Sequence, residues 1–223
     1  KRNTRRAVKP SKPSNVNQSM SKIISMPPDL VAKCVEALPE WLRHHVESGY
    51  KRNLSIAGGF VRDTIGGYAV KDIDVFFWSD GQLNDAKEVA SIHGGELTVT
   101  PQSYTYASKS GEHPPVSLIK DIGCPIFNDR IQDFDFECCM GEITYHRGAW
   151  EGCMSEQFLD DVKAKRLTFT GQVSFPDDNG IGAMIRAVKF VGRGWSIDTP
   201  NLLAIGMNIR EKSTRTSTTI HQS

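Results

Sequence analysis

The chain of 223 residues has no C-x-x-C pair and no long apolar run, and its opposite charges nearly cancel. Its five cysteines form an odd set without zinc-ligand spacing, which argues against a disulfide framework and a zinc site and favours a reducing compartment. No apolar stretch approaches the length of a membrane span, and no apolar signal core follows the basic N-terminus. We therefore expect a soluble, cytoplasmic protein with no membrane partner.

The formal net charge of +1 provides no overall basic field, so any contact with nucleic acid has to come from a local patch. Hydrophobic residues make up 39% of the chain and charged residues 24%. At this length, these fractions predict one globular domain with a small extension.

The most informative stretch runs from Leu54 to Phe77 and reads LSIAGGFVRDTIGGYAVKDIDVFF. It begins with a short apolar run, which predicts a buried strand, and Gly58 and Gly59 then allow a sharp turn and a close approach to a ligand. A helix is expected directly after the two glycines. The unpaired N–H groups of its first turn, with the positive end of its dipole, would form a seat for a phosphate.

A second glycine pair, at 66–67, ends this helix and leads into a predicted strand over 70–77. Asp72 and Asp74 are two residues apart, so they project from the same face of that strand. At about 4 Å their charges repel by roughly 1 kcal/mol in water and roughly 4 kcal/mol at an intermediate dielectric, so a cation is expected between them. Magnesium, which prefers oxygen ligands and substrate phosphates, fits this pair. Alone, a D-x-D is usually surface charge and a G-G usually a turn, but their spacing between apolar strands favours a functional site.

The segments Gly58–Asp63 (GGFVRD) and Lys71–Asp74 (KDID) resemble the signature of the polymerase-β-like nucleotidyltransferases. The matching group contains the bacterial-type CCA-adding enzymes and poly(A) polymerases. The resemblance implies an α/β (α+β) catalytic head with a mixed sheet flanked by helices, followed by a helical neck. It also implies two Mg²⁺ ions, a nucleoside triphosphate (NTP) as substrate, and transfer of a nucleoside monophosphate to an acceptor hydroxyl, most simply an RNA 3′ end. Gly58 and Gly59 would cradle phosphates beside Arg62, whereas Asp63 would be structural.

The third acid of the metal site is expected on a strand over 135–143, where Asp135 and Glu137 would share one face. The segment 134–136 resembles the one that supplies this acid in related enzymes. It makes Asp135 the third metal ligand and the leading candidate for the general base, although activation by the metal alone would also serve. Asp133 and Glu137 are the alternatives for the third ligand, and an ordinary amphipathic strand is the structural alternative.

Two later segments extend the resemblance. Residues 158–169 resemble the end of the catalytic head, and 185–190 resemble the R-x-x-R-F segment of the neck, with Lys189 at the second arginine. On a helix, Arg186, Lys189 and Arg193 share one face. They would contact triphosphate or an RNA end, or else form a solvated face.

These patterns predict four parts: a flexible basic arm over 1–25, a catalytic head over 26–170, a neck fragment over 171–212 and a polar tail over 213–223. The arm could touch RNA or be only a solvated tail. Other expected elements are listed here: a helix from 28 to about 43, a helix over 84–93, strands over 96–100, 103–107 and 116–122, and a short helix over 126–134. His44 and His45 are expected to be structural.

Two departures from the family pattern limit the resemblance. No E-D-x-x-R segment, with which CCA-adding enzymes choose the incoming base, follows Asp198, and the body and tail that hold tRNA have no counterpart. The base, the acceptor and the oligomeric state are therefore left open. The alternatives to RNA 3′-end transfer are nucleotidylation of a protein or small molecule, and a non-catalytic module that binds nucleotide or RNA.

Overall fold

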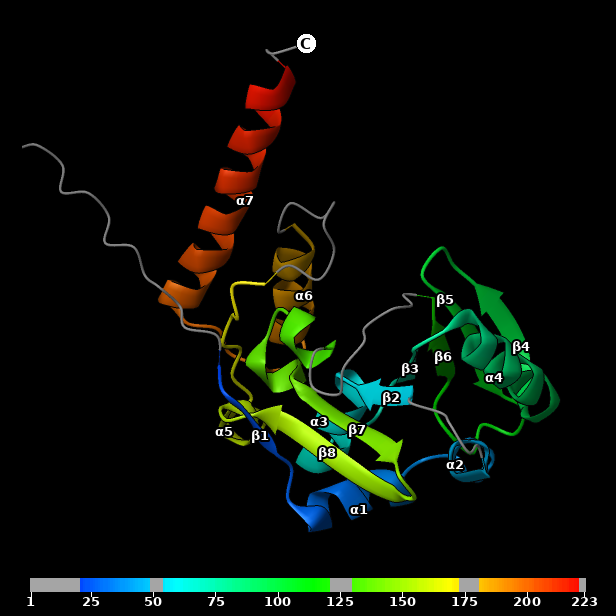
Figure 1. The fold of residues 1–223 in the computed structure, drawn as a ribbon. Coiled ribbons are helices and arrows are strands. Elements are labelled where there is room, and N and C mark those ends of the chain that lie inside the picture. The colour runs from blue at the N-terminus through cyan, green and yellow to red at the C-terminus, as the bar shows by residue number, and fades with distance from the viewer. Residues whose placement is uncertain (1–20, 49–53, 121–129, 173–180, 221–223) are drawn as a thin grey trace, which may run out of the picture.

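The computed structural model describes residues 21–48, 54–120, 130–172 and 181–220, with side chains up to 209. Eight strands form one mixed sheet in the order β1-β8-β7-β2-β3-β6-β5-β4 (Figure 1). β3 and β6 are parallel, and the other neighbouring strands are antiparallel. The strands are β1 (Ile23–Ser25), β2 (Leu54–Ala57), β3 (Ile73–Phe77), β4 (Gly94–Val99), β5 (Ser103–Ser108), β6 (Val116–Ile119), β7 (Gly141–His146) and β8 (Ala149–Ser155).

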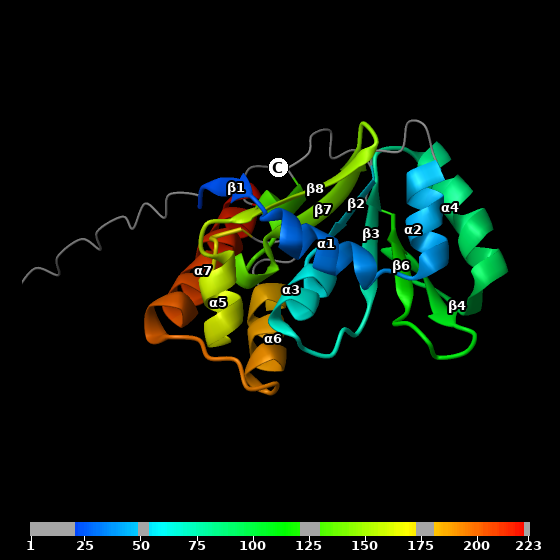
Figure 2. The same ribbon diagram turned by 90° about the horizontal axis from the view of Figure 1, so that it is seen from below.

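Helices cover one face of this sheet (Figure 2). The α-helices are α1 (Pro28–Glu36), α2 (Glu40–Ser48), α3 (Gly59–Gly66), α4 (Asp80–His93), α5 (Phe158–Ala164), α6 (Ile181–Val191) and α7 (Thr199–Ile220), with 3₁₀ turns η1 (Arg130–Asp133) and η2 (Glu137–Cys139). α3 packs against the central strands, α1 packs against β8, and α4 packs against β3, β4, β5 and β6. The mixed sheet with flanking helices confirms the predicted fold class.

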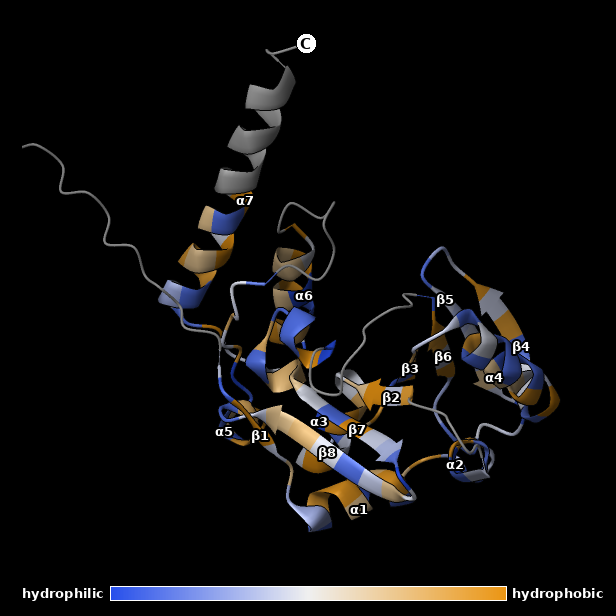
Figure 3. Ribbon diagram, in the orientation of Figure 1, coloured by the Kyte–Doolittle hydropathy of each residue, from blue (hydrophilic) through white to orange (hydrophobic). Residues whose placement is uncertain are grey.

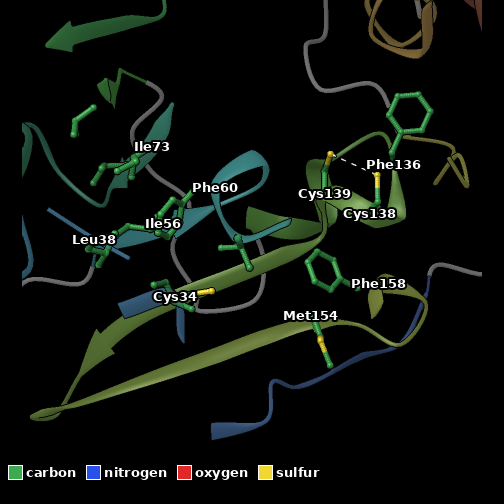
Figure 4. Close-up of a cluster of buried hydrophobic side chains, with 14 of the residues drawn as sticks. Cys34, Leu38, Ile56, Phe60, Ile73, Phe136, Cys138, Cys139, Met154 and Phe158 are labelled. Atoms are coloured by element: carbon green, nitrogen blue, oxygen red, sulfur yellow. Dashed lines mark hydrogen bonds between the residues drawn. The ribbon is translucent and has the colours of Figure 1, made fainter. Parts of the chain in front are cut away.

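The main core lies between the sheet and these helices. Ile56, Val75 and Ile143 alternate along β2, β3 and β7 with residues of the other face, and all three are fully buried. Phe60 and Phe158 pack into the same core from α3 and α5 (Figure 4). Burying each side chain of this size stabilises the fold by roughly 1.5–3 kcal/mol before entropy.

A second, smaller cluster consists of Ala57, Ile131, Met140 and Cys153, with Phe134 packed against it. Because Ala57 follows Ile56 on β2, the alternation of strand side chains puts this cluster on the opposite face of the sheet. The sheet therefore carries apolar packing on both faces near β2, and orange residues occur along β2 in Figure 3.

α6 and α7 follow the head segment, and α7 leads away from the sheet (Figure 1). β1 falls inside the segment predicted as an arm and pairs with β8, whereas residues 1–20 lie outside the described residues. Within the described parts of the chain, no helix is both long and apolar enough to cross a membrane. The boundaries of the four parts stay predictions.

Several predicted elements are present with shifted ends. The helix expected from 28 to 43 is two helices, because Pro39 has no N–H to continue the first one. α4 begins before the predicted helix, at a Ser79 N-cap whose hydroxyl accepts from the N–H of Gln82. The strands expected over 70–77 and 116–122 are shorter, and part of the short helix expected over 126–134 lies outside the described residues.

The predicted strand over 135–143 is wrong in its first half. The chain turns there through η2, in which the N–H of Cys139 donates to the carbonyl of Phe136 at 2.8 Å and that of Met140 to Glu137 at 3.0 Å. β7 begins only at Gly141. Asp135 and Glu137 therefore do not lie on one face of a strand, because a 3₁₀ turn replaces the two-residue repeat on which that prediction rested.

Candidate active site

The glycine turn at the end of β2 requires the residue it has. Gly58 has φ +77° and ψ −124°, a backbone conformation that residues other than glycine rarely adopt. Its N–H donates to the carbonyl of Gly141 at 3.0 Å. A Cβ atom on Gly58 would also meet the Phe134 ring at 3.2 Å. The turn thus directs the chain from β2 straight into α3, as predicted from the sequence.

The start of α3 lies beside the first predicted metal ligand. A Cβ on Gly59 would be 3.9 Å from Oδ1 of Asp72 and 3.6 Å from Nη2 of Arg62. No side chain caps the first turn of α3, and its far end is closed by Gly67, whose φ is +68°. The N-terminal end of α3 and the Asp72 carboxylate therefore border the same space.

Asp72 and Asp74 act on each other electrostatically, as two carboxylates on one face should. Burial raises the pKa of Asp74 to about 7, and the charge of Asp72 adds to the rise. Ile73 and Val75 on either side are fully buried beneath the helices, so Asp74 faces the other side of the sheet. The pair thus favours a nearby cation, and two carboxylates with substrate phosphates are a usual magnesium ligand set.

The predicted third acid is held in an ion pair. Asp135 is 2% exposed, and its Oδ2 accepts from Nε of Arg186 at 2.5 Å. Among the residues that the structure describes, no three His, Cys, Asp or Glu side chains are placed to hold a metal ion. The structure therefore brings Asp72 and Asp74 together, but not Asp135 with them. Of the two alternatives, Asp133 is exposed, and Glu137 is buried with its carboxylate hydrogen-bonded to Ser21.

Arg62 is enclosed by protein. Its Nε and Nη2 donate to the two carboxylate oxygens of Asp63 at 2.7 and 2.8 Å, and its Nη1 donates to Sγ of Cys139 at 3.4 Å. The guanidinium carbon lies 4.8 Å from the centre of the Phe190 ring and 5.6 Å from that of Trp195. Burial alone would lower the pKa of Arg62, but Cys139 and Asp63 keep it above its ordinary value. This residue thus connects α3 to α6, and Asp63 has the structural position expected of it.

The three basic residues predicted to share a helix face are in different environments, and one of them, Arg193, lies beyond the end of α6. Arg186 is half-buried on Asp135, whereas Lys189 and Arg193 are exposed. The side of α6 that faces the protein buries Ala183, Ala187 and Phe190. Ile181, Ile185 and Val188, which the helical spacing predicts as part of a buried apolar face, are exposed instead, so that prediction is wrong. The basic residues divide between an internal ion pair and the surface.

A row of hydroxyl groups beside Asp74 was not predicted. The parallel pairing of β3 with β6 puts Ser117 in register with Asp74. The Ser117 hydroxyl lies 2.9 Å from that of Thr105, which lies 3.3 Å from the hydroxyl of Ser103. Ser103 and Thr105 alternate along β5, and this two-residue repeat was the only sequence signal for them.

A separate hollow of about 870 Å³ lies between α2, α4 and the turn after β5. It is lined by Trp41 and by four of the six histidines of the chain, His44, His45, His93 and His113. The Trp41 and His93 rings are parallel, and the indole N–H donates to His113 at 3.4 Å. α4 packs on the helix-covered face of the sheet, so this hollow is not part of the Asp72–Asp74 site.

The raised pKa of Asp74 leads to a prediction about pH and metal. Between about pH 4 and pH 7 the folded protein retains a proton that the unfolded chain releases, so the stability this group contributes is present below pH 4 and lost as the pH rises through 7. We expect Mg²⁺ with a nucleotide to bind the ionised pair, and only in the folded state. It should therefore raise the Tm, and more at pH 8 than at pH 6.

Thermal unfolding of the wild type and of Asp74→Asn at both pH values, with and without Mg²⁺ and ATP, tests this prediction. In the variant, the loss of stability with rising pH should be smaller and the ligand effect weaker. Equal Tm shifts in both proteins would show that the ligand does not bind at this pair.

Comparison with known proteins gives a family and a fold. A family model described as "Gabija anti-defense 2 family protein" matches residues 30–165. A protein named "Gabija anti-defense 2", from Bacillus phage SPbetaL7, is 24% identical over 169 residues, which are 74% of this chain and 40% of that protein. The chain therefore spans less than half the length of this relative.

Solved structures that resemble this chain include CCA-adding enzymes. The Thermotoga maritima CCA-adding enzyme complexed with tRNA has a TM-score of 0.60 at 17% identity, over 86% of this chain and 47% of that one. A CCA-adding enzyme with CTP has a TM-score of 0.60 at 16% identity, over 87% of this chain and 48% of that one. The predicted resemblance to the head of these enzymes is confirmed at the level of the fold.

Proposed function

This chain belongs to the Gabija anti-defense 2 family, and on that premise we propose that it is a metal-dependent nucleotidyltransferase. The observation that carries the proposal is the Asp72–Asp74 pair beside the uncapped start of α3, with the pKa of Asp74 raised to about 7. A carboxylate pair next to helix N–H groups suits a metal ion that bridges to phosphates. The fold of the CCA-adding enzymes supports the same chemistry.

In this proposal, Asp72 and Asp74 hold Mg²⁺ together with the phosphates of an NTP. The first-turn N–H groups of α3 donate to phosphate oxygens, which Gly58 and Gly59 admit because they have no side chain. Bound there, Mg²⁺ would lower the pKa of the acceptor hydroxyl and neutralise the leaving pyrophosphate. Arg62 would orient the glycine turn from its fixed position on Asp63.

The proposal retains Asp135 as a third ligand, which would allow a second ion. To bind a metal ion, Asp135 would have to release Arg186, and the freed guanidinium could then bind a phosphate. Lys189, exposed on the same helix, would add a second cation for triphosphate or for the end of an acceptor. Asp135 would also be the leading candidate for the general base.

We propose an RNA 3′ end as the acceptor. In support of RNA, the structural neighbours include a CCA-adding enzyme complexed with tRNA. The name of the phage relative, which refers to action against Gabija, favours a second candidate, a protein acceptor that belongs to that defence. A module that binds nucleotide or RNA without catalysis is the third possibility, and the intact aspartate pair argues against it.

Transfer of label identifies the acceptor. Each of the four NTPs, labelled at the α-phosphate, is incubated with Mg²⁺, the protein and either a pool of RNA or a cell extract that contains Gabija. We expect label in RNA, dependent on Mg²⁺ and absent with Asp74→Asn. Label in protein alone would favour the second candidate. If nothing is labelled and Asp74→Asn binds nucleotide as the wild type does, the enzymatic proposal fails.

A further inference from the structure

The two edges of the sheet differ in how well they are protected. β1 has three residues and is followed by Pro27 and Pro28, so it offers a further strand little room. β4, at the other edge, has six residues, contains no proline and carries one charged side chain, Glu96 (Figure 1). A register shift between Gly94 and Leu97 disturbs only its first half. Natural sheets rarely leave such an edge open.

Among the residues that the structure describes, the β4 backbone groups of Leu97 and Val99 have no partner strand. The N–H of Thr100 donates to the carbonyl of Ser103 at 2.9 Å, so these two residues are a hydrogen-bonded pair of the β4–β5 hairpin. Hydrogen-bonded and non-hydrogen-bonded pairs alternate along antiparallel strands. Leu97 and Val99, opposite Tyr106 and Tyr104, are therefore in non-hydrogen-bonded pairs, and their N–H and C=O groups point away from β5.

The side chains at this edge are also exposed. Leu97 is 45% and Val99 57% exposed, although both are large apolar residues of a strand. Two apolar side chains and the outward backbone groups of the same two residues thus form one short strip, which we call the β4 edge.

We propose that the β4 edge joins two copies of this chain, antiparallel, about a twofold axis at Thr98. In that register Leu97 of each copy lies opposite Val99 of the other, so the outward backbone groups of these residues face each other and can exchange hydrogen bonds. The same register pairs the apolar side chains. Glu96 lies opposite Thr100 of the other copy, so the like charges do not oppose one another.

This self-complementarity is the reason for choosing a second copy as the occupant. A twofold contact uses the same patch of both copies. When two antiparallel copies of the segment 96–100 face each other, Leu97 lies opposite Val99 and Glu96 lies opposite Thr100. Apolar side chains therefore meet apolar ones, and the carboxylate meets a hydroxyl. The product is a continuous sheet across both copies. Two strands, β6 and β5, separate the contact from β3 and its Asp74, so the contact does not depend on the proposed chemistry.

Cross-linking tests the geometry directly. Thr98 would lie opposite Thr98 of the other copy in a non-hydrogen-bonded pair. Their Cα atoms would be about 4.5 Å apart, which is within the range for a disulfide. We expect Thr98→Cys to form a disulfide dimer under mild oxidation. Thr100→Cys is the matched control, because its copies would be about 13 Å apart. Both variants also carry Cys124→Ser, since the other four cysteines are buried.

Sedimentation equilibrium measures the association without a cross-link. The wild-type mass should rise from 24.8 kDa toward twice that value with concentration. Val99→Lys should weaken association at least about tenfold because it places a cation against the apolar strip of the other copy. Val191→Lys, at a residue of α6 with 48% exposure, is the matched control and should leave association unchanged.

Three results would overturn this pairing. In the first, the mass of the wild type stays at 24.8 kDa at every concentration and the Thr98→Cys variant does not form a disulfide dimer. The second is a dimer that Val191→Lys disrupts and Val99→Lys does not, which would move the contact to α6. The third is a monomer whose β4 edge receives a strand from another protein.

Discussion

Asp74→Asn should reduce transfer of a nucleoside monophosphate by about a thousandfold at saturating Mg²⁺ and NTP. The expected loss corresponds to about 4 kcal/mol, since a metal ion contributes several kcal/mol of charge stabilisation to the transition state. The amide retains the shape of the side chain and removes one charge. The measurement is the initial rate of label transfer from an α-labelled NTP, with the acceptor that the screen identifies.

Asp80→Asn is the matched control for this variant. Asp80 is exposed in the first turn of α4, six residues along the chain, and its substitution removes the same charge from the surface. We expect its rate to stay within about twofold of the wild type, because a surface charge distant from the phosphates is screened. Comparable rates for Asp74→Asn and the wild type would contradict a role for Asp74 in holding the metal.

The same variant separates function from stability. At pH 8 without metal, Asp74→Asn should unfold at a Tm equal to or above that of the wild type, because it removes a desolvated charge and its repulsion with Asp72. A variant that loses activity while it gains stability cannot owe the loss to misfolding. A fall in both would indicate that Asp74 instead has a structural role.

Arg62→Met should lower the free energy of unfolding by about 3–5 kcal/mol, the usual cost of removing one partner from a buried ion pair. The Asp63 carboxylate is 7% exposed, and both of its oxygens accept from Arg62. Without the guanidinium, this charge is left buried and unpaired, and the Phe190 and Trp195 rings lose the cation between them. Urea unfolding at a constant m-value measures the change.

Two further variants decide what Arg62 does. Arg193→Met is the matched control: Arg193 is exposed and lies 6.0 Å from the centre of the same Phe190 ring, so its loss should cost below about 1 kcal/mol. Arg62→Met with Asp63→Leu should recover most of the lost stability, because both buried charges leave together. A stable Arg62→Met variant with a raised KM for NTP would instead assign Arg62 to the nucleotide, as the sequence predicted.

The predictions from sequence held where the responsible residues are neighbours in the chain. Gly58, Gly59 and the apolar run before them were read correctly as a strand, a turn and a helix start, and the structure adds the positive φ of Gly58. The two-residue spacing of Asp72 and Asp74 likewise placed them near one another. Local patterns were sufficient here because strand alternation and turn geometry depend on a few consecutive residues.

The predictions failed where one pattern allowed two backbone geometries. Residues 135–138 alternate as a strand should, yet η2 begins at Glu137, where Phe136 pairs with Phe169 and the turn packs against α5. The helix expected from 28 to 43 divides at Pro39, although its apolar stripe continues in both halves. Packing against distant segments decided the first case, whereas the missing N–H of Pro39 decided the second.

The sequence by itself determined the glycine turn and the two-residue spacing of Asp72 and Asp74, because these depend on residues close together in the chain. The mixed sheet with helices was expected from the resemblance to nucleotidyltransferase heads. Only the tertiary structure decided which groups those residues meet. It pairs Asp135 with Arg186, 51 positions later, encloses Arg62 between α3 and α6, sets Ser117 beside Asp74 and leaves β4 at the edge. Strand order and register bring such groups together, and these depend on the packing of the whole sheet, which no local spacing encodes.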